Sequence, residues 1–290
     1  MSLTFLARMR LFFLAAAFAL TTVAASADEP PNARAAYAER RGLLEADTQC
    51  RLFTPDIRIA LQVTAAQARG ALLRSGWNDA QMRELEQAAV NAARARQCGD
   101  ARTTQAADNA RHAFMRWVNA GTMQFPGWER TWVARRAVID EPAWRLSQAI
   151  DAPLAATFGV REQNGAQHLV LVIPLARGAT APASVSIVMR DTVRARAAQV
   201  SLPQRMSYGI AAGAPQPTAA ARLPSTRTIE RLDGGRSQAV FTFPDNAFRT
   251  LLALDPRESV AFDLATGRST QRLYAEVGDV GAARTFLTID

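Results

Sequence analysis

Aromatic and cationic residues are concentrated between positions 117 and 144. Four of the five tryptophans lie there together with three arginines: Trp117, Trp128, Trp132, Trp144, Arg130, Arg135 and Arg136. Tryptophan faces can hold a sugar ring and guanidinium groups can hold anions, so this composition is typical of a ligand groove. The alternative is that the rings pack between two parts of the protein, because large amphipathic rings bury well at such joints. The candidate ligand-binding residues are Trp128, Arg130, Trp132, Arg135 and Arg136.

Apart from Trp117, this cluster falls within a seam segment, residues 122–150, that is expected to be helical. Phe125-Pro126-Gly127 interrupts the chain before the first predicted helix of this segment. A helix would then place Trp128 and Trp132 one turn apart. Asp140-Glu141-Pro142 is expected to begin another short helix that runs through Ile150.

The only two cysteines, Cys50 and Cys98, bracket a predicted pair of helices of similar length. Helices of about twenty residues carry the chain about 30 Å out and about 30 Å back, so both cysteines arrive at the same end. A disulfide closing this 49-residue loop stabilises the fold by about 4 kcal/mol in the chain-entropy model. Two cysteines without nearby histidines do not complete a metal site. The alternative to the disulfide is a pair of buried free thiols.

Acidic side chains in the C-terminal half offer other chemistry. Glu258, Asp263, Glu276 and Asp279 could supply the two carboxylates of a hydrolase. The structural alternatives are helix capping for Asp245 and Asp279 and a solvated strand face for Glu276. No nucleophile elbow, phosphate-binding loop, dinucleotide fingerprint or zinc-protease motif is present. The sequence therefore indicates no cofactor and no metal, and it favours a protein that is not an enzyme.

The first 27 residues have the layout of a secretory signal peptide. Arg8 and Arg10 precede an apolar run over 11–20, and Ala25-Ser26-Ala27 forms a small-x-small cleavage site. Cleavage after Ala27 would deliver the protein to a bacterial periplasm or to the exterior, where disulfides form. The alternative, an uncleaved anchor, is disfavoured because the apolar run is short for a bilayer. No transmembrane segment is expected after cleavage.

Every basic residue is an arginine. The 34 arginines give a formal net charge of +8, or +6 without Arg8 and Arg10. Arginine forks match carboxylates and phosphates, which permits a polyanionic partner. However, the arginines are scattered among 26 acidic residues, and no nucleic-acid-binding motif is present. We therefore expect no nucleic-acid partner.

Residues 28–121 are expected to form an antiparallel helical bundle. A first helix runs from Pro31 to about Gln49, and Thr54 caps the next, which begins at Pro55 and ends near Gly76. Short connections between such helices favour antiparallel neighbours.

Capping signals define the other helices of this bundle. Asn78 and Gln81 are spaced as a capping box at the start of one helix, and Gly99 is expected to end it in the left-handed conformation. Asp100 is expected to cap a last helix that reaches about Gly121.

Residues 151–290 are expected to form an antiparallel β-rich domain with two short helices, which makes the fold class α+β. Three hairpins are predicted, with turns at Asn164-Gly165, Asp233-Gly234-Gly235 and Thr266-Gly267. The segment 203–225 is rich in proline, alanine and glycine and is predicted to be a loop.

Three functions remain open. The first is an exported, non-enzymatic protein that docks onto an envelope protein or polymer, which the missing catalytic motifs favour. The second is binding of an anionic or sugar-containing envelope polymer at the seam segment. The third is a carboxylate-dependent hydrolase.

Overall fold

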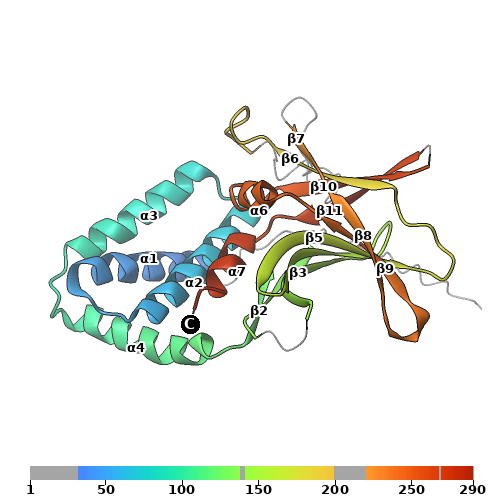
Figure 1. Ribbon diagram of the computed structural model, residues 1–290. Coiled ribbons are helices and arrows are strands. Elements are labelled where there is room, and N and C mark those ends of the chain that lie inside the picture. The colour runs from blue at the N-terminus through green and yellow to red at the C-terminus, as the bar shows by residue number, and fades with distance from the viewer. Residues whose placement is uncertain (1–31, 138–140, 199–219, 268, 290) are drawn as a thin grey trace, which may run out of the picture.

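The computed structural model describes residues 32–137, 141–198, 220–267 and 269–289. The predicted signal peptide and positions 203–219 of the predicted loop lie outside these ranges. The described chain has an α+β fold, as predicted, with four helices followed by antiparallel strands and two short helices. Figure 1 shows the four helices on one side of the molecule and the strands on the other.

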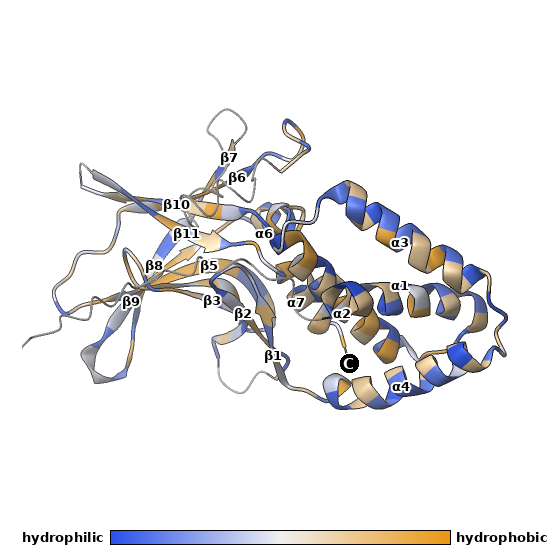
Figure 2. Cartoon of the chain, turned by 180° about the vertical axis from the view of Figure 1, so that it is seen from behind, coloured by the Kyte–Doolittle hydropathy of each residue, from blue (hydrophilic) through white to orange (hydrophobic). Residues whose placement is uncertain are grey.

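The helical region consists of α1 (Ala33–Cys50), α2 (Pro55–Arg74), α3 (Asp79–Arg94) and α4 (Ala101–Val118). Helix α1 packs against both α2 and α3 and separates them, so these two do not form the closely packed pair that the sequence suggested. Figure 2 shows hydrophilic residues along much of α3 and α4. No helix among the described residues has the length and apolar character needed to cross a bilayer.

The disulfide prediction is confirmed. Cys50 and Cys98 are bonded, with their Cα atoms 5.4 Å apart. The bond joins the end of α1 to the chain that follows α3. It therefore fastens together helices that are distant in sequence at one end of the helical region.

Two capping predictions are confirmed. The Asn78 side chain accepts a hydrogen bond from the backbone N–H of Gln81 at 3.0 Å, and the Gln81 side chain accepts one from the backbone N–H of Asn78 at 2.9 Å. Asp100 accepts a bond from the backbone N–H of Thr103 at 2.9 Å. The short polar side chains thus satisfy N–H groups that a helix start leaves free.

Two predictions about helix starts are confirmed in position only. Thr54 is the N-cap of α2, which begins at Pro55 as predicted, and Asp279 is the N-cap of the last helix, but neither side chain makes a capping bond. Two other predictions about helix ends are wrong. Asp245 lies inside the first turn of its helix, where Pro244 is the N-cap. Gly99 is not left-handed, because α3 already ends at Arg94.

The β-rich region contains two antiparallel sheets, which its alternating sequence did not separate. The order of the seven-stranded sheet is β1 (Thr122–Pro126), β2 (Thr131–Arg135), β3 (Ala143–Ile150), β4 (Ala156–Gln163), β5 (Ala166–Leu175), β9 (Ser237–Thr242) and β8 (Thr226–Arg231). The order of the four-stranded sheet is β11 (Ser269–Glu276), β10 (Ser259–Thr266), β6 (Ser184–Arg190) and β7 (Ala220–Pro224). The three predicted hairpins are confirmed as β4–β5, β8–β9 and β10–β11.

The prediction that the seam segment is helical is wrong, because β1, β2 and β3 occupy it. Trp132 and Ala134 are buried at a spacing of two residues, as are Leu146 and Gln148. This is the period of a strand with one buried face. The four-residue spacing of Trp128 and Trp132 suggested a helix, but the period of two determines the structure.

The end of the predicted 203–225 loop is also corrected. Positions 220–224 form β7, which pairs with β6 although Pro224 is its last residue. Only Ser225 separates β7 from β8, so the chain passes here from one sheet to the other. The Ser225 hydroxyl donates a 2.8 Å hydrogen bond to the Val185 carbonyl.

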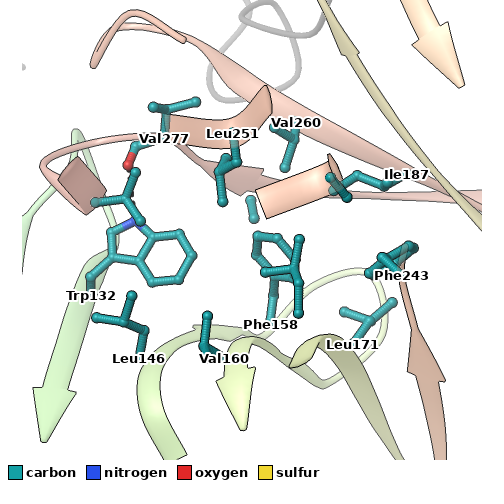
Figure 3. Packing of buried hydrophobic residues seen from close by; sticks show 14 of the residues in the cluster. Trp132, Leu146, Phe158, Val160, Leu171, Ile187, Phe243, Leu251, Val260 and Val277 are labelled. Carbon is teal, nitrogen blue, oxygen red and sulfur yellow. Dashed lines mark hydrogen bonds between the residues drawn. The ribbon is translucent and has the colours of Figure 1, made fainter. Parts of the chain in front are cut away.

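The two sheets enclose one core. Figure 3 shows Trp132, Leu146 and Phe158 facing Val260 and Val277 across it. The Phe158 ring centroid lies 5.6 Å from that of Trp132 and 4.8 Å from that of Phe262. Helices α6 (Asp245–Leu252) and α7 (Val280–Phe286) add apolar residues to this core, and α7 also packs against α2.

Candidate anion-binding site

The five predicted binding residues separate into three places. Trp128, Arg130 and Trp132 lie around the end of β11. Arg135 is exposed and donates a 3.3 Å hydrogen bond to the Ser147 hydroxyl. Arg136 borders a cavity. The structure therefore does not bring the five residues into one groove.

The turn between β1 and β2 encloses the carboxylate of Glu276. Glu276 Oε2 accepts backbone N–H bonds from Trp128 at 2.8 Å, Arg130 at 3.0 Å and Glu129 at 3.2 Å. Successive N–H groups of this kind form a concave cradle for an anion. Gly127 is required here, because a Cβ atom would lie 2.1 Å from Oε2. The expected solvated face for Glu276 is therefore wrong, since this residue is fully buried.

Two buried side chains hold the backbone of the same residue. Trp132 Nε1 donates to the carbonyls of Glu276 and Val277, each at 3.0 Å. The Gln148 amide accepts from Glu276 N–H at 2.8 Å and donates to its carbonyl at 3.2 Å. Trp132 is thus part of a joint between β2 and β11 and does not face a ligand.

A buried ion pair connects this joint to the helical region. Arg74 donates to the two carboxylate oxygens of Asp279 at 2.8 and 3.0 Å, and only 10% and 2% of the two side chains are exposed. Burial raises the pKa of the Asp279 carboxyl, while the hydrogen bonds and charge of Arg74 act in the opposite direction. The pair fixes α2 against the start of α7.

The other two acids considered for a hydrolase are also paired. Arg190 donates to both carboxylate oxygens of Glu258, at 2.6 and 2.8 Å. Asp263 lies 2.5 Å from Arg272 and 2.5 Å from Arg222, and hydrogen bonds from these arginines, chiefly Arg272, lower its pKa. Both carboxylates are therefore engaged by arginines in structural contacts.

The strongest candidate for a ligand site is a cavity of about 530 Å³. The end of α4 and the residues between α4 and β1 meet here with the residues after β2, with strand β3 and with the residues after α7. The cavity is lined by Val118, Asn119, Ala120, Gly121, Arg136, Ala137, Arg145, Leu287 and Ile289. The described residues of this lining carry two guanidinium groups and one side-chain amide, and none of them is an acid.

Arg136 is held in place at the cavity. Its Nη1 atom donates to the carbonyl of Val118 and, at 3.4 Å, to that of Ala120. The guanidinium carbon lies 5.6 Å from the centroid of the Phe286 ring, a cation–π distance. These contacts with described residues use one terminal nitrogen, Nη1, and orient the guanidinium group. Nη2 and Nε can therefore donate hydrogen bonds to a ligand.

Arg145 lies in the same lining with an incomplete set of hydrogen bonds. Its side chain is 13% exposed, and its Nε forms an ion pair with Glu162 Oε2 at 3.7 Å, which is longer than a hydrogen bond. Among the described residues, this buried Nε has no hydrogen-bond acceptor. Because Nε has no access to solvent, a ligand in the cavity would contact the terminal nitrogens of Arg145.

No family model, curated protein or solved structure matches this chain. Only the residues themselves therefore bear on its function. Within the described ranges, no three His, Cys, Asp or Glu side chains gather as a possible metal site.

Sequence reasoning identified Arg136 but missed Arg145 and Gln148. The alternation of Leu146, Gln148 and Ile150 is typical of a strand and marks Gln148 as an inward polar residue. Nothing in the sequence marks Arg145, because its place at the cavity depends on the path of α4 and of the residues after α7.

Proposed function

We propose that this is an exported, non-enzymatic, envelope-associated protein that binds an anionic group of an envelope polymer. The observation that supports the proposal is the pair of guanidinium groups, Arg136 and Arg145, in a cavity of about 530 Å³. Ligand cavities usually measure about 300–1,000 Å³ and carry a few polar groups that orient the ligand.

Export is supported by residues 1–27 and by the disulfide. The basic start, the apolar run and the site after Ala27 have the layout of a cleaved signal peptide. The Cys50–Cys98 bond agrees with an oxidising compartment. We therefore propose the periplasm or the exterior of a bacterium as its location.

Binding is favoured over hydrolysis by the setting of the acids. A carboxylate hydrolase needs one carboxyl group to deliver a proton and the other to act as a base or nucleophile. Arginines engage Glu258, Asp263 and Asp279, and backbone N–H groups engage Glu276. These contacts favour structural roles for all four.

The lining suggests a carboxylated or phosphorylated sugar unit as the bound group. Guanidinium forks match the oxygens of carboxylates and phosphates. The Asn119 amide can pair with a hydroxyl group, while Leu287 and Ile289 offer apolar contact to a ring face. The cavity is also large enough for more than a bare anion.

Isothermal titration calorimetry of the oxidised protein tests the proposal. The probes are polygalacturonate, polyphosphate and the neutral polymer dextran. We expect binding of at least one anionic probe, no binding of dextran, and weaker binding as salt is added. Arg136→Gln and Arg145→Gln should each weaken binding by about tenfold or more, because a hydrogen bond to a charged group contributes about 1.5–3 kcal/mol.

The matched control is Arg135→Gln. Arg135 is the neighbour of Arg136 and carries the same charge, but it is exposed and does not line the cavity. Equal binding by the wild type, Arg136→Gln and Arg145→Gln would show that the anion does not bind at this cavity. Failure of both anionic probes to bind would overturn the proposed function. Thermal unfolding of each variant separates lost binding from lost folding.

A further inference from the structure

The far edge of the seven-stranded sheet suggests a second binding surface. Strand β8 stands at the end of this sheet and pairs with β9 alone among the described strands. Every residue of β8 is exposed except Glu230, which is half-buried. The candidate anion-binding cavity borders β1 to β3, at the opposite end of the same sheet.

The pairing with β9 determines which backbone groups of β8 face outward. Leu232 N–H donates to the Arg236 carbonyl at 2.9 Å, which makes this a hydrogen-bonded pair. In an antiparallel ladder, hydrogen-bonded and non-bonded pairs alternate. Because Leu232 is in a bonded pair, the residues at odd positions before it are in non-bonded pairs with β9. These residues are Arg227, Ile229 and Arg231. Their N–H and C=O groups therefore point to the open edge.

The same three residues share one face of the strand. Arg227, Ile229 and Arg231 are spaced by two residues, so their side chains project to the same side. Ile229 is 47% exposed. The edge thus presents a cation, an apolar group and a second cation in a row, each beside outward-facing backbone groups. Arg227 Nη1 already donates a 3.0 Å hydrogen bond to the Pro182 carbonyl, a neutral acceptor that leaves the positive charge of the group uncompensated by this contact.

We propose that β8 binds an extended acidic peptide segment of another protein, which adds a strand to this edge. Its sequence pattern would be acid, any residue, apolar, any residue, acid. Each acid would lie opposite an arginine, and the apolar residue would lie opposite Ile229, as favourable cross-strand pairs. The pattern reads the same in both directions, so it fits a parallel or an antiparallel strand.

Charge argues against a second copy of this chain as the occupant. Two β8 strands paired antiparallel about Ile229 would place Arg227 of each copy opposite Arg231 of the other. Like charges directly opposite one another destabilise a strand pair. The acid within β8 does not neutralise them, because the carboxylate of Glu230 accepts hydrogen bonds from Arg161 at 3.2 Å and from Gln238 at 2.6 Å.

Fluorescence anisotropy with labelled peptides tests this edge. The acidic probe is the peptide Thr-Glu-Thr-Val-Thr-Glu-Thr, and the control peptide replaces both Glu with Lys. We expect the oxidised full-length protein to bind the acidic peptide at least about tenfold more tightly than the lysine peptide. The substitution Arg231→Glu should abolish this preference, because Arg227 still attracts one acid while the new carboxylate repels the other, and Arg116→Glu, at an exposed position of α4, should leave it unchanged.

A backbone variant tests strand addition itself. Ile229→Pro removes an N–H that points to the open edge, where proline is tolerated, and should weaken peptide binding by about tenfold or more. Arg136→Gln should leave peptide binding unchanged, so failure of the proposed function and failure of this inference can be told apart. Equal binding of the two peptides by the wild type, or an undiminished preference in Arg231→Glu, would overturn the inference. Dimerisation through β8 in analytical ultracentrifugation, without peptide binding, would identify a second copy as the occupant and also overturn it.

Discussion

The helical and β-rich regions are stabilised in different ways. The β-rich region has one large core in which the rings of Trp132, Phe158 and Phe262 contact one another. The helical region has two smaller clusters that contain several alanines. Alanine buries little apolar surface, and stabilisation scales with the area removed from water. A covalent cross-link therefore accounts for a larger share of the stability of a region with this composition. The disulfide between the protein's two cysteines lies in this region.

The joint between the two regions is stabilised in a third way, by polar contacts that are buried. Arg74 and Asp279 form a bidentate ion pair, and the carboxylate of Glu276 is held by backbone N–H groups. Polar contacts of this kind impose one geometry, since any displacement leaves a buried charge without a partner. We therefore expect single substitutions in the joint to destabilise the protein more than substitutions in either region.

The largest expected effect is at this ion pair. Asp279→Ala leaves the Arg74 guanidinium buried without its carboxylate, and breaking such a pair costs about 3–5 kcal/mol. Urea unfolding followed by circular dichroism measures the loss. The control is Asp108→Ala, which breaks the half-exposed pair with Arg111 and should cost about 1 kcal/mol or less. Similar losses of unfolding free energy in the two variants would show that the joint is no more sensitive to substitution than the surface of the helical region.

Loss of the disulfide comes next. The double variant Cys50→Ser, Cys98→Ser should lose at most about 4 kcal/mol in the chain-entropy model. The loss should be regional, with faster amide hydrogen exchange in α1 and α3 and little change in β4 and β5. Equal acceleration in both regions would mean that they unfold as one unit and that the disulfide does not stabilise the helical region in particular.

A smaller effect is expected at the Glu276 cradle. Glu276→Gln places an amide NH₂ group among backbone N–H donors and should cost about 2 kcal/mol through unsatisfied polar groups. Thermal unfolding at neutral pH measures the loss. An unchanged melting temperature would show that the cradle adds little to the joint.

The smallest effect concerns pH and the helical region. Burial, followed by the charge of Glu86, raises the pKa of Tyr37 to about 12, and the Tyr37 hydroxyl donates to Glu86 at 3.0 Å. Between the ordinary tyrosine pKa of about 10 and this value, the unfolded chain loses its proton first, so stability should fall as pH rises. From pH 9 to 11 the loss should be about 1 kcal/mol and should be absent in Tyr37→Phe. Urea unfolding at both pH values measures it, and an identical pH dependence in the variant would contradict it.

Local signals in the sequence predicted much of the fold. The confirmed signals depend only on residues that are close in the sequence. They are the capping pair Asn78 and Gln81, the cap Asp100, and the three glycine-containing turns. The disulfide also followed from short-range reasoning about helix length. Where a tertiary partner decides the outcome, the prediction is wrong. Asp279 is positioned to cap a helix but binds Arg74, and Glu276 lies near a strand end but is enclosed by a distant turn.

The candidate site was predictable only in part. Arg136 was identified by composition, but the neighbours that make it useful come from distant segments: Asn119 at the end of α4, Arg145 on β3 and Leu287 after α7. Their meeting depends on strand pairing in the seam segment, which has the period of two that a helical reading of the tryptophans ignores.

The sequence separation of Arg74 and Asp279 has a consequence for biosynthesis. The two residues are 205 positions apart, and a ribosome adds about 5–20 residues each second. About ten to forty seconds therefore pass between the synthesis of α2 and that of its ionic partner. The cysteines, only 48 positions apart, are both present much sooner. On a chain that enters an oxidising compartment from its amino end, the disulfide can therefore form before the late-arriving acid completes the attachment of α2 to α7.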